Sequence, residues 1–216
     1  TRRSVLTAAA LLAASATGLA ATRQPQGGSG GKLKKLKLGV SIYTGWMPWY
    51  LANADGMVKA WGEAKGYDIE VVLCPDYNSS VTAYVTGQVD ALVVTNMDAL
   101  FSLAAAGQDT TAIIMGDYSN GNDAIVVYGF DEAVKKNPDL AKNPMQFLKG
   151  KEATILTNTV THYLGARGCQ QSGMKLSDVT WKHVDSESDI NSAFSDKKIK
   201  ACGTWNPVVM QLLQLP

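Results

Sequence analysis

The chain has 216 residues, of which 46% are hydrophobic and 18% charged, and its formal net charge is +1. These values are ordinary for a globular protein and exclude a disordered or collagen-like chain. A net charge this close to zero gives no support to nucleic-acid binding, and the basic run at residues 32–37 reads as a solvated surface segment. We therefore expect a folded protein with no nucleic-acid partner.

The first residues have the features of an export signal. Residues 1–7 resemble the twin-arginine motif, residues 8–16 form a short apolar stretch, and residues 18–20 are small, as a signal peptidase requires. A stretch this short with a basic start is a removable signal and not a membrane span. We expect a signal peptide at 1–21, a flexible leader at 22–34, and a soluble periplasmic protein with no stable membrane insertion.

From residue 35 onward, apolar runs of strand type alternate with helical stretches that end at glycines. The continuous β-branched run at 69–73 suits a strand that is buried on both faces. Within the second helix Trp61 is expected in the core, and Asp90 is expected to stabilise its turn. This alternation predicts a mainly parallel sheet with helices on both sides. The expected strands are 36–42, 69–73, 91–94 and 111–115, and the expected helices are 48–54, 57–65, 79–86 and 97–106.

The rhythm changes at residues 117–123, where polar residues separate two apolar strands without an intervening helix. We interpret this segment as a crossover into a second α/β unit, which predicts a two-lobed α/β protein with lobe 1 at 35–118 and lobe 2 at 119–216. Asn137-Pro138 and Asn143-Pro144 mark turns or helix starts. The expected strands of lobe 2 are 124–128, 153–156, 179–184 and 201–204, and its expected helices are 144–148, 161–172 and 190–194.

Seven of the apolar runs are expected to end in a short polar or aromatic cluster, and none of the seven clusters contains Lys or Arg. In an open α/β sheet, ligands bind at the carboxyl ends of the strands. A site rich in Asp, Asn and Trp that lacks fixed positive charge suits a small neutral or cationic ligand. The clusters are residues 43–50, 74–80, 95–99, 117–123, 157–162, 185–190 and 203–207.

Nine residues in these clusters are candidate ligand contacts. Asp98 and Asp123 can accept hydrogen bonds from a guanidinium or an amide, and aromatic rings can stack on a cation, which contributes roughly 0.5–2 kcal/mol each. A sulfonate or nitrate binder would normally add Arg or Lys to balance the anion, although helix N-termini also favour anions. The nine candidates are Tyr43, Trp46, Trp49, Tyr77, Asn96, Asp98, Asn122, Asp123 and Trp205.

Each candidate also has a purely structural interpretation. Asp98 could be a helix N-cap without a ligand role, and Asp123 could serve a turn at the crossover. Asn96 and Asn122 could likewise be ordinary turn residues, and the tryptophans could pack in the core. The sequence leaves both interpretations open for every one of these positions.

Catalytic and metal-binding patterns are poor. Of the two histidines, His162 is either a helix-start residue or a ligand contact, and His183 lies inside a predicted strand. No His/Cys cluster indicates a metal site, and no glycine-rich motif indicates a nucleotide. We therefore expect no catalytic residue, no metal and no cofactor.

The three cysteines, Cys74, Cys169 and Cys202, are too few and too widely spaced for a disulfide framework. We expect each to be a small buried side chain, with a Cys169–Cys202 bridge as the alternative in an oxidising compartment.

Three segments carry a resemblance to a known family. The stretch at 54–72, the turn Gly87-Gln-Val-Asp-Ala91 and the strand end Thr95-Asn-Met-Asp98 resemble the substrate-binding proteins of ABC importers, in the nitrate/sulfonate/taurine-type branch. The likeness extends over about residues 35–207. Within that branch, residues 95–100, 119–123 and 203–207 look most similar to the binding proteins encoded beside urea- or guanidine-carboxylase genes.

The resemblance implies a type II periplasmic-binding-protein fold with two lobes, a monomer that works with a membrane permease, and no enzymatic activity. It implies urea, guanidine or a related amide or amidine as the ligand. Family members return to lobe 1 after lobe 2, so this chain is expected to be truncated at its C-terminus. The alternatives are a sulfonate or nitrate binder of the same family, or an enzyme of pyrimidine-precursor type on the same fold.

Overall fold

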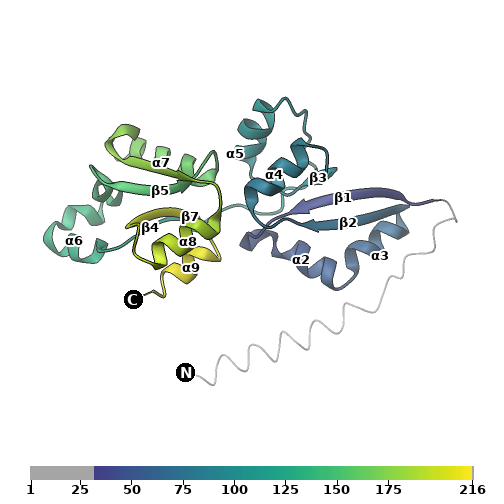
Figure 1. The fold of residues 1–216 in the computed structure, drawn as a ribbon, viewed down its shortest axis with the longest axis horizontal. Helices are drawn as coiled ribbons and strands as arrows, with labels where there is room; N and C mark the ends of the chain where they lie inside the picture. Colours follow the sequence, from purple (N-terminus) through teal and green to yellow (C-terminus); the bar gives the residue numbers. More distant parts are fainter. Residues whose placement is uncertain (1–31, 216) are drawn as a thin grey trace, which may run out of the picture.

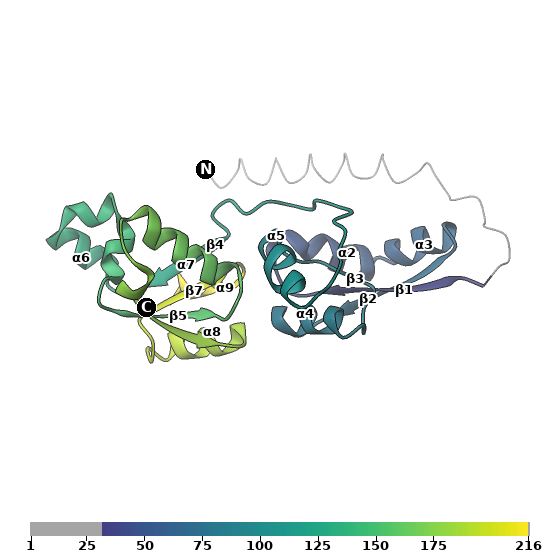
Figure 2. The same ribbon diagram turned by 90° about the horizontal axis from the view of Figure 1, so that it is seen from above.

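A computed structural model describes residues 32–215 of the chain. Two α/β units lie side by side, each built on a sheet of its own, and they are joined by a long connecting segment (Figure 1). The same arrangement is visible from above (Figure 2). The predicted signal peptide at 1–21, and the predicted leader as far as residue 31, lie outside the described residues.

The first unit, which we call lobe 1, holds a parallel three-stranded sheet in the order β2-β1-β3. Helices α2 and α3 lie on one face of this sheet and α4 on the other (Figure 1). Gly87 ends the α4 segment with a positive φ of 70°, a conformation that glycine adopts without strain. The elements are β1 (Lys34–Val40), η1 (Thr44–Trp46), α2 (Met47–Ala54), α3 (Met57–Ala64), β2 (Tyr67–Leu73), α4 (Tyr77–Val85), β3 (Ala91–Leu92), α5 (Asn96–Asp98) and the π-helical turn η2 (Ala99–Leu103).

Two burial predictions for lobe 1 are wrong. Trp61 is 55% exposed, because the buried residue of α3 is its neighbour Gly62, about 100° further round the helix. The backbone of α3 comes so near β2 at Gly62 that a Cβ there would lie 3.0 Å from Ile69. Strand β2 is an edge strand, and its last residue, Leu73, is 51% exposed, so the run is not buried on both faces. The Asp90 carboxylate, in the turn before β3, accepts a hydrogen bond from the Lys37 N–H of β1 at 2.8 Å and so attaches this turn to the sheet.

The second unit, lobe 2, contains a four-stranded sheet in the order β4-β7-β5-β6. Strand β5 runs parallel to β6 and β7, whereas β4 runs antiparallel to β7. The predicted α/β class, with mainly parallel sheets and flanking helices, is confirmed. The elements are β4 (Asp123–Val127), α6 (Phe130–Lys136), η3 (Pro138–Ala141), η4 (Pro144–Leu148), β5 (Glu152–Leu156), α7 (Val160–Gln171), η5 (Leu176–Asp178), β6 (Thr180–Val184), α8 (Glu187–Ser195), β7 (Ala201–Trp205) and α9 (Val208–Leu212).

The strand predicted at 111–115 does not form. Residues 108–119, which connect the lobes, contain neither helix nor strand. A strand needs a hydrogen-bonded neighbour, and among the described residues none pairs with this segment. The apolar side chains that suggested a strand are instead exposed, by 80% at Ile113 and 93% at Met115.

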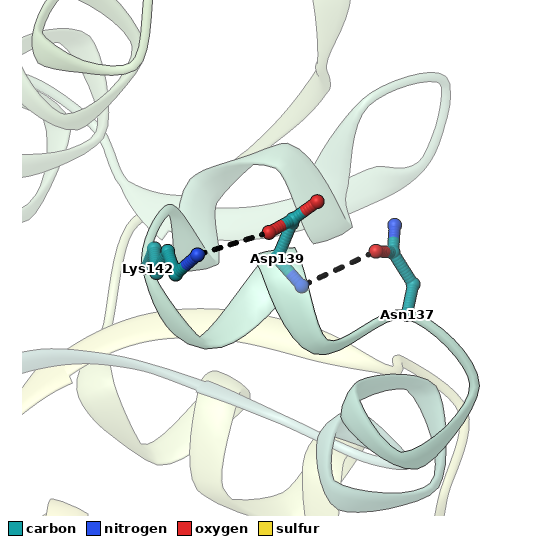
Figure 3. Close-up of polar contacts among 3 residues, drawn as sticks. All are labelled: Asn137, Asp139 and Lys142. Carbon is teal, nitrogen blue, oxygen red and sulfur yellow. Dashed lines mark hydrogen bonds and ion pairs between the residues drawn. The ribbon is translucent and has the colours of Figure 1, made fainter.

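The Asn-Pro dipeptides do start helical turns, as predicted. The Asn137 side chain accepts a hydrogen bond from the Asp139 N–H at 3.3 Å, and the Lys142 ammonium donates to the Asp139 carboxylate at 3.3 Å (Figure 3). The second dipeptide starts η4, with Asn143 as the N-cap and Pro144 as the first residue, and the helix predicted at 144–148 is a 3-10 helix. Both turns lie at the end of lobe 2 that is remote from lobe 1 (Figure 1).

Two groups of buried apolar residues stabilise the structure. One lies within lobe 2 alone, and the other includes residues of both lobes, such as Val40, Tyr77 and Leu156. All three cysteines are buried and free, so the alternative of a Cys169–Cys202 bridge is wrong. Among the described helices, none has both the length and the apolar run that crossing a bilayer requires.

Candidate ligand-binding site

The polar clusters meet where the two lobes face each other. Six of them follow or overlap the ends of strands, and the seventh, at 117–123, precedes β4 and follows no strand. This cluster nevertheless lies at the same edge of the sheet as the other clusters of lobe 2. Strand β4 pairs antiparallel with β7, which places Asp123 opposite Trp205, the last residue of β7. The start of an antiparallel strand therefore lies at the same edge as the carboxyl ends of its neighbours.

Four rings from both lobes form one buried aromatic cluster, consisting of Tyr43, Trp46, Tyr77 and Trp205. Each is less than a tenth exposed, from 2% at Tyr77 to 7% at Tyr43. The Tyr43 and Trp46 ring centroids lie 4.8 Å apart, and Trp205 lies 5.8 Å from Tyr77 and 6.3 Å from Tyr43. Tilted and edge-on rings at such distances attract each other. Lobe 1 supplies three of the rings and lobe 2 the fourth, so the cluster lies between the lobes.

Asp98 is 1% exposed, and both of its carboxylate oxygens are used by protein hydroxyls. Oδ2 accepts hydrogen bonds from Tyr77 and Thr95, each at 2.7 Å, and Oδ1 accepts one from Ser102 at 2.9 Å. The Asp98 side chain caps no helix: Thr95 is the N-cap of α5 and accepts from the Asp98 N–H at 3.2 Å, and the Asp98 carboxylate makes no capping bond at the start of η2. Burial and the adjacent Asp98 charge raise the pKa of Tyr77, which keeps its hydroxyl protonated as the donor.

Asp123 differs from Asp98 in having one oxygen without a partner. Oδ2 accepts hydrogen bonds from Tyr43 at 3.2 Å and from Ser119, but Oδ1 is buried and unpaired. The adjacent Asn122 Nδ2 is also buried without a partner. Burial and the Asp123 charge raise the pKa of Tyr43, so Tyr43 also remains a donor. The site therefore presents one free acceptor and one free donor on consecutive residues.

Two hydroxyls at strand ends are unpaired as well. Ser41 directly follows β1, and Thr204 is the penultimate residue of β7; the hydroxyl oxygen of each is buried without a partner. A buried polar atom without a partner costs about 1–3 kcal/mol. These unpaired atoms belong to residues at the ends of strands from both lobes, which makes them candidate contacts for a solute.

Hydrogen bonds also link the two lobes beside the aromatic cluster. The Tyr77 N–H donates to Glu187 at 3.3 Å, and the Asn78 side chain donates to the Asp185 carbonyl at 3.0 Å. Burial raises the pKa of Glu187. Sequence reasoning did not single out Glu187, although the cluster at 185–190 contains it. The available signal was the N-cap Ser186 with acidic residues in the first helical turn.

Some candidates lie apart from this centre. Asn96 is exposed at the start of α5, and Trp49 is half-buried and packs against the outside of the core. His162 is in the first turn of α7, as predicted, with its ring centroid 5.3 Å from that of His183. Burial and the neighbouring His183 lower the pKa of His162. His162 lines a cavity of about 220 Å³ between the lobes, together with Met97, Phe101 and Tyr163.

The charges in the site are negative only. The residues that bond or stack around the aromatic cluster include Asp98, Asp123 and Glu187 but no Lys or Arg. Within residues 32–215, no group of three or more His, Cys, Asp or Glu side chains is arranged to hold a metal ion. The bonded network around the aromatic cluster therefore combines unpaired hydrogen-bonding groups with carboxylates and no positive side chain.

Two lobes, parallel sheets and a site at the facing strand ends define the type II periplasmic-binding-protein fold, and the solved structures that resemble this chain have it. The alkanesulfonate-binding protein SsuA from Xanthomonas axonopodis pv. citri superposes with a TM-score of 0.62 at 19% identity, covering 85% of this chain and 58% of its own. For the periplasmic aliphatic sulphonate binding protein SsuA from Escherichia coli the TM-score is 0.57 at 18% identity, and the match covers 84% of this chain and 57% of that protein. The periplasmic nitrate-binding protein NrtA from Synechocystis PCC 6803 gives 0.57 at 14% identity, with 84% and 49% covered.

The chain thus spans between 49% and 58% of the length of these three proteins. No protein-family model and no curated protein sequence matches it. At these identities the comparisons show the fold, and the ligand has to be argued from the site.

Proposed function

We propose that this chain is the solute-binding component of an ABC importer, exported to the periplasm, with lobe 1 at 35–118 and lobe 2 at 119–216. It binds a small amide or amidine of the urea or guanidine class between the lobes and performs no chemistry on it. The fold and the location of the candidate residues between the lobes support this function.

The pair of unpaired atoms on Asn122 and Asp123 carries the ligand proposal. Asp123 Oδ1 requires a hydrogen-bond donor, and Asn122 Nδ2 requires an acceptor. Urea offers N–H groups and a carbonyl oxygen in one plane, whereas guanidinium offers donors only. The absence of Lys and Arg from the bonded network around Asp98 and Asp123 also favours a neutral or cationic solute. Within the proposed class, a urea-type amide therefore complements the site best.

The remaining candidates have supporting roles in this proposal. Tyr43, Trp46, Tyr77 and Trp205 form the walls, which exclude water and strengthen the polar contacts. Asp98 orients the Tyr77 hydroxyl. Trp49 and Asn96 lie at the rim.

Binding is coupled to the relative position of the lobes. The Tyr77–Glu187 and Asn78–Asp185 hydrogen bonds exist only when the lobes are together. A solute that fills the unpaired groups stabilises this closed arrangement because it binds that arrangement more tightly than an open one. The closed form is then the one that docks on a membrane permease.

Calorimetric titration with urea, guanidinium, taurine and nitrate tests the proposal. We expect urea to bind, and we expect Asp123→Asn to weaken it at least tenfold, as the loss of about 1.5–3 kcal/mol at a charged acceptor implies. Asp139→Asn is the matched control, since the Asp139 side chain is 84% exposed in a turn of lobe 2 (Figure 3). This variant should bind urea with the affinity of the wild type. Binding of taurine or nitrate without binding of urea or guanidinium would overturn the assignment.

A sulfonate or nitrate ligand is the second candidate, and the names of the structural neighbours favour it. The anion would have to be held by Asn122, by the hydroxyls of Ser41 and Thr204, and by backbone N–H groups, close to the negative charge of Asp123. On this alternative Asp123→Asn strengthens binding, because it removes a repulsive charge, so the same variant separates the two candidates.

A further inference from the structure

A second cavity lies in lobe 2, away from the candidate site. It has a volume of about 470 Å³ and is lined by residues of the β4 end, η4, the start of β5 and the segment that leads into β7. Cavities that bind small molecules typically measure about 300–1,000 Å³. The space is therefore large enough for a small organic ligand.

Strand β7 separates this cavity from the candidate site. Ala201, at the start of β7, lines the cavity, whereas Trp205, at its end, belongs to the aromatic cluster. Four residue steps in a strand span about 13 Å at a rise of about 3.3 Å per residue. The cavity consequently opens at the end of the sheet that faces away from lobe 1 and could be occupied independently of the first site.

The cavity is lined by more positive than negative charge. Lys151, Lys198 and Lys200 line it, and Glu152 is the one carboxylate in the lining. Glu152 lies 3.7 Å from the Lys182 ammonium, and Lys198 lies 2.8 Å from Asp196. Within the described part of the chain, neither Lys151 nor Lys200 has a carboxylate within 4.0 Å. Two ammonium groups are thus left without a carboxylate partner at the cavity.

Both of these ammonium groups lie over aromatic rings. Lys151 Nζ is 3.2 Å from the Phe147 ring centroid, and Lys200 Nζ is 5.6 Å from that of Tyr128. Cation–π attraction holds an ammonium near a ring but does not neutralise its charge. Partial burial lowers the pKa of Lys151, because desolvation disfavours the charged form. An anion in the cavity would supply the missing partner.

We propose that this cavity binds a small organic anion with a flat, apolar body, such as an aromatic carboxylate. Its carboxylate pairs with Lys151 and Lys200, and its apolar body occupies the space lined by Tyr128, Phe147 and the buried Leu148. The proposal concerns a site separate from the one between the lobes and does not depend on the solute bound there.

Benzoate is the probe for this site, with neutral benzamide as the matched ligand. We expect benzoate to shift the backbone amide resonances of residues 147–154 and 198–201 in a two-dimensional NMR titration, and to bind at least tenfold more tightly than benzamide. Lys151→Met and Lys200→Met should each weaken benzoate several-fold. Lys59→Met, on α3 of lobe 1, should leave it unchanged.

Both substituted lysines are exposed, so the variants are expected to fold, and their circular dichroism spectra verify this. Equal binding of benzoate and benzamide would overturn the proposal. So would benzoate shifts confined to residues around the aromatic cluster, or full retention of benzoate binding in both lysine variants.

Discussion

Asp98 and Asp123 accept hydrogen bonds from different rings of the same aromatic cluster, but we predict that their removal affects different properties of the protein. Asp98 has no free acceptor, since three hydroxyls already donate to it. Asp123 keeps Oδ1 unpaired. Asp98→Asn should therefore reduce stability, and Asp123→Asn should reduce solute binding.

The expected magnitude for Asp98→Asn follows from its three bonds. The new amide oxygen can replace Oδ2 and keep the Tyr77 and Thr95 bonds, but the amide nitrogen cannot accept from Ser102. A hydrogen bond to a charged group contributes about 1.5–3 kcal/mol and a neutral one about 0.5–1.5 kcal/mol. Losing one bond and weakening two lowers the free energy of unfolding by about 2–4 kcal/mol. For a chain of this size, that corresponds to a fall in Tm of about 5–15 °C.

Differential scanning calorimetry without denaturant is the suitable assay, because urea and guanidinium are themselves candidate ligands. Asp123→Asn should lower the free energy of unfolding by no more than about 1 kcal/mol, since the amide retains an oxygen that can accept from Tyr43. Its urea affinity should nevertheless fall at least tenfold. If the two variants lose the same stability and the same affinity, the distinction between a filled and an open carboxylate is wrong.

Three further predictions concern the lobes and the core. Burial raises the pKa of Glu187 above its ordinary 4.5, so its protonation stabilises the folded protein and this contribution is lost as the pH rises through the raised value. Glu187→Gln should thus gain Tm relative to the wild type between pH 4.5 and neutrality. Gly203→Ala should lower the free energy of unfolding by about 1–3 kcal/mol, because its Cβ would lie 3.1 Å from a core side chain. Gly116→Ala is the control: its Cβ would meet nothing within 4 Å, so its Tm should equal that of the wild type. Trp46→Ala should lower the free energy of unfolding by about 3–5 kcal/mol, because Trp46 is buried, and Trp61→Ala by less than about 1 kcal/mol, because Trp61 is exposed. Equal losses would contradict this difference in burial.

Local patterns in the sequence were sufficient for the fold class and for the sheet edge at which the candidate residues lie. Runs such as 153–156 and 201–204 have the composition and spacing of buried strands, and turn chemistry at Asn137-Pro138 depends only on neighbouring residues. The same holds for the polar clusters, since a residue that directly follows a parallel strand lies at its carboxyl end in any such sheet.

Only the tertiary structure decided which chain segments and side chains meet. The segment at 111–115 has the composition of a strand, but a strand exists only where another pairs with it, and that depends on distant residues. Trp61 and Gly62 are adjacent in sequence, yet the approach of β2 to α3 determines which of them is buried. Asp98 and Asp123 look equivalent in the sequence. They differ because hydroxyls from separate segments fill the first and leave one oxygen of the second free, and such partners are selected by packing between segments far apart in the chain.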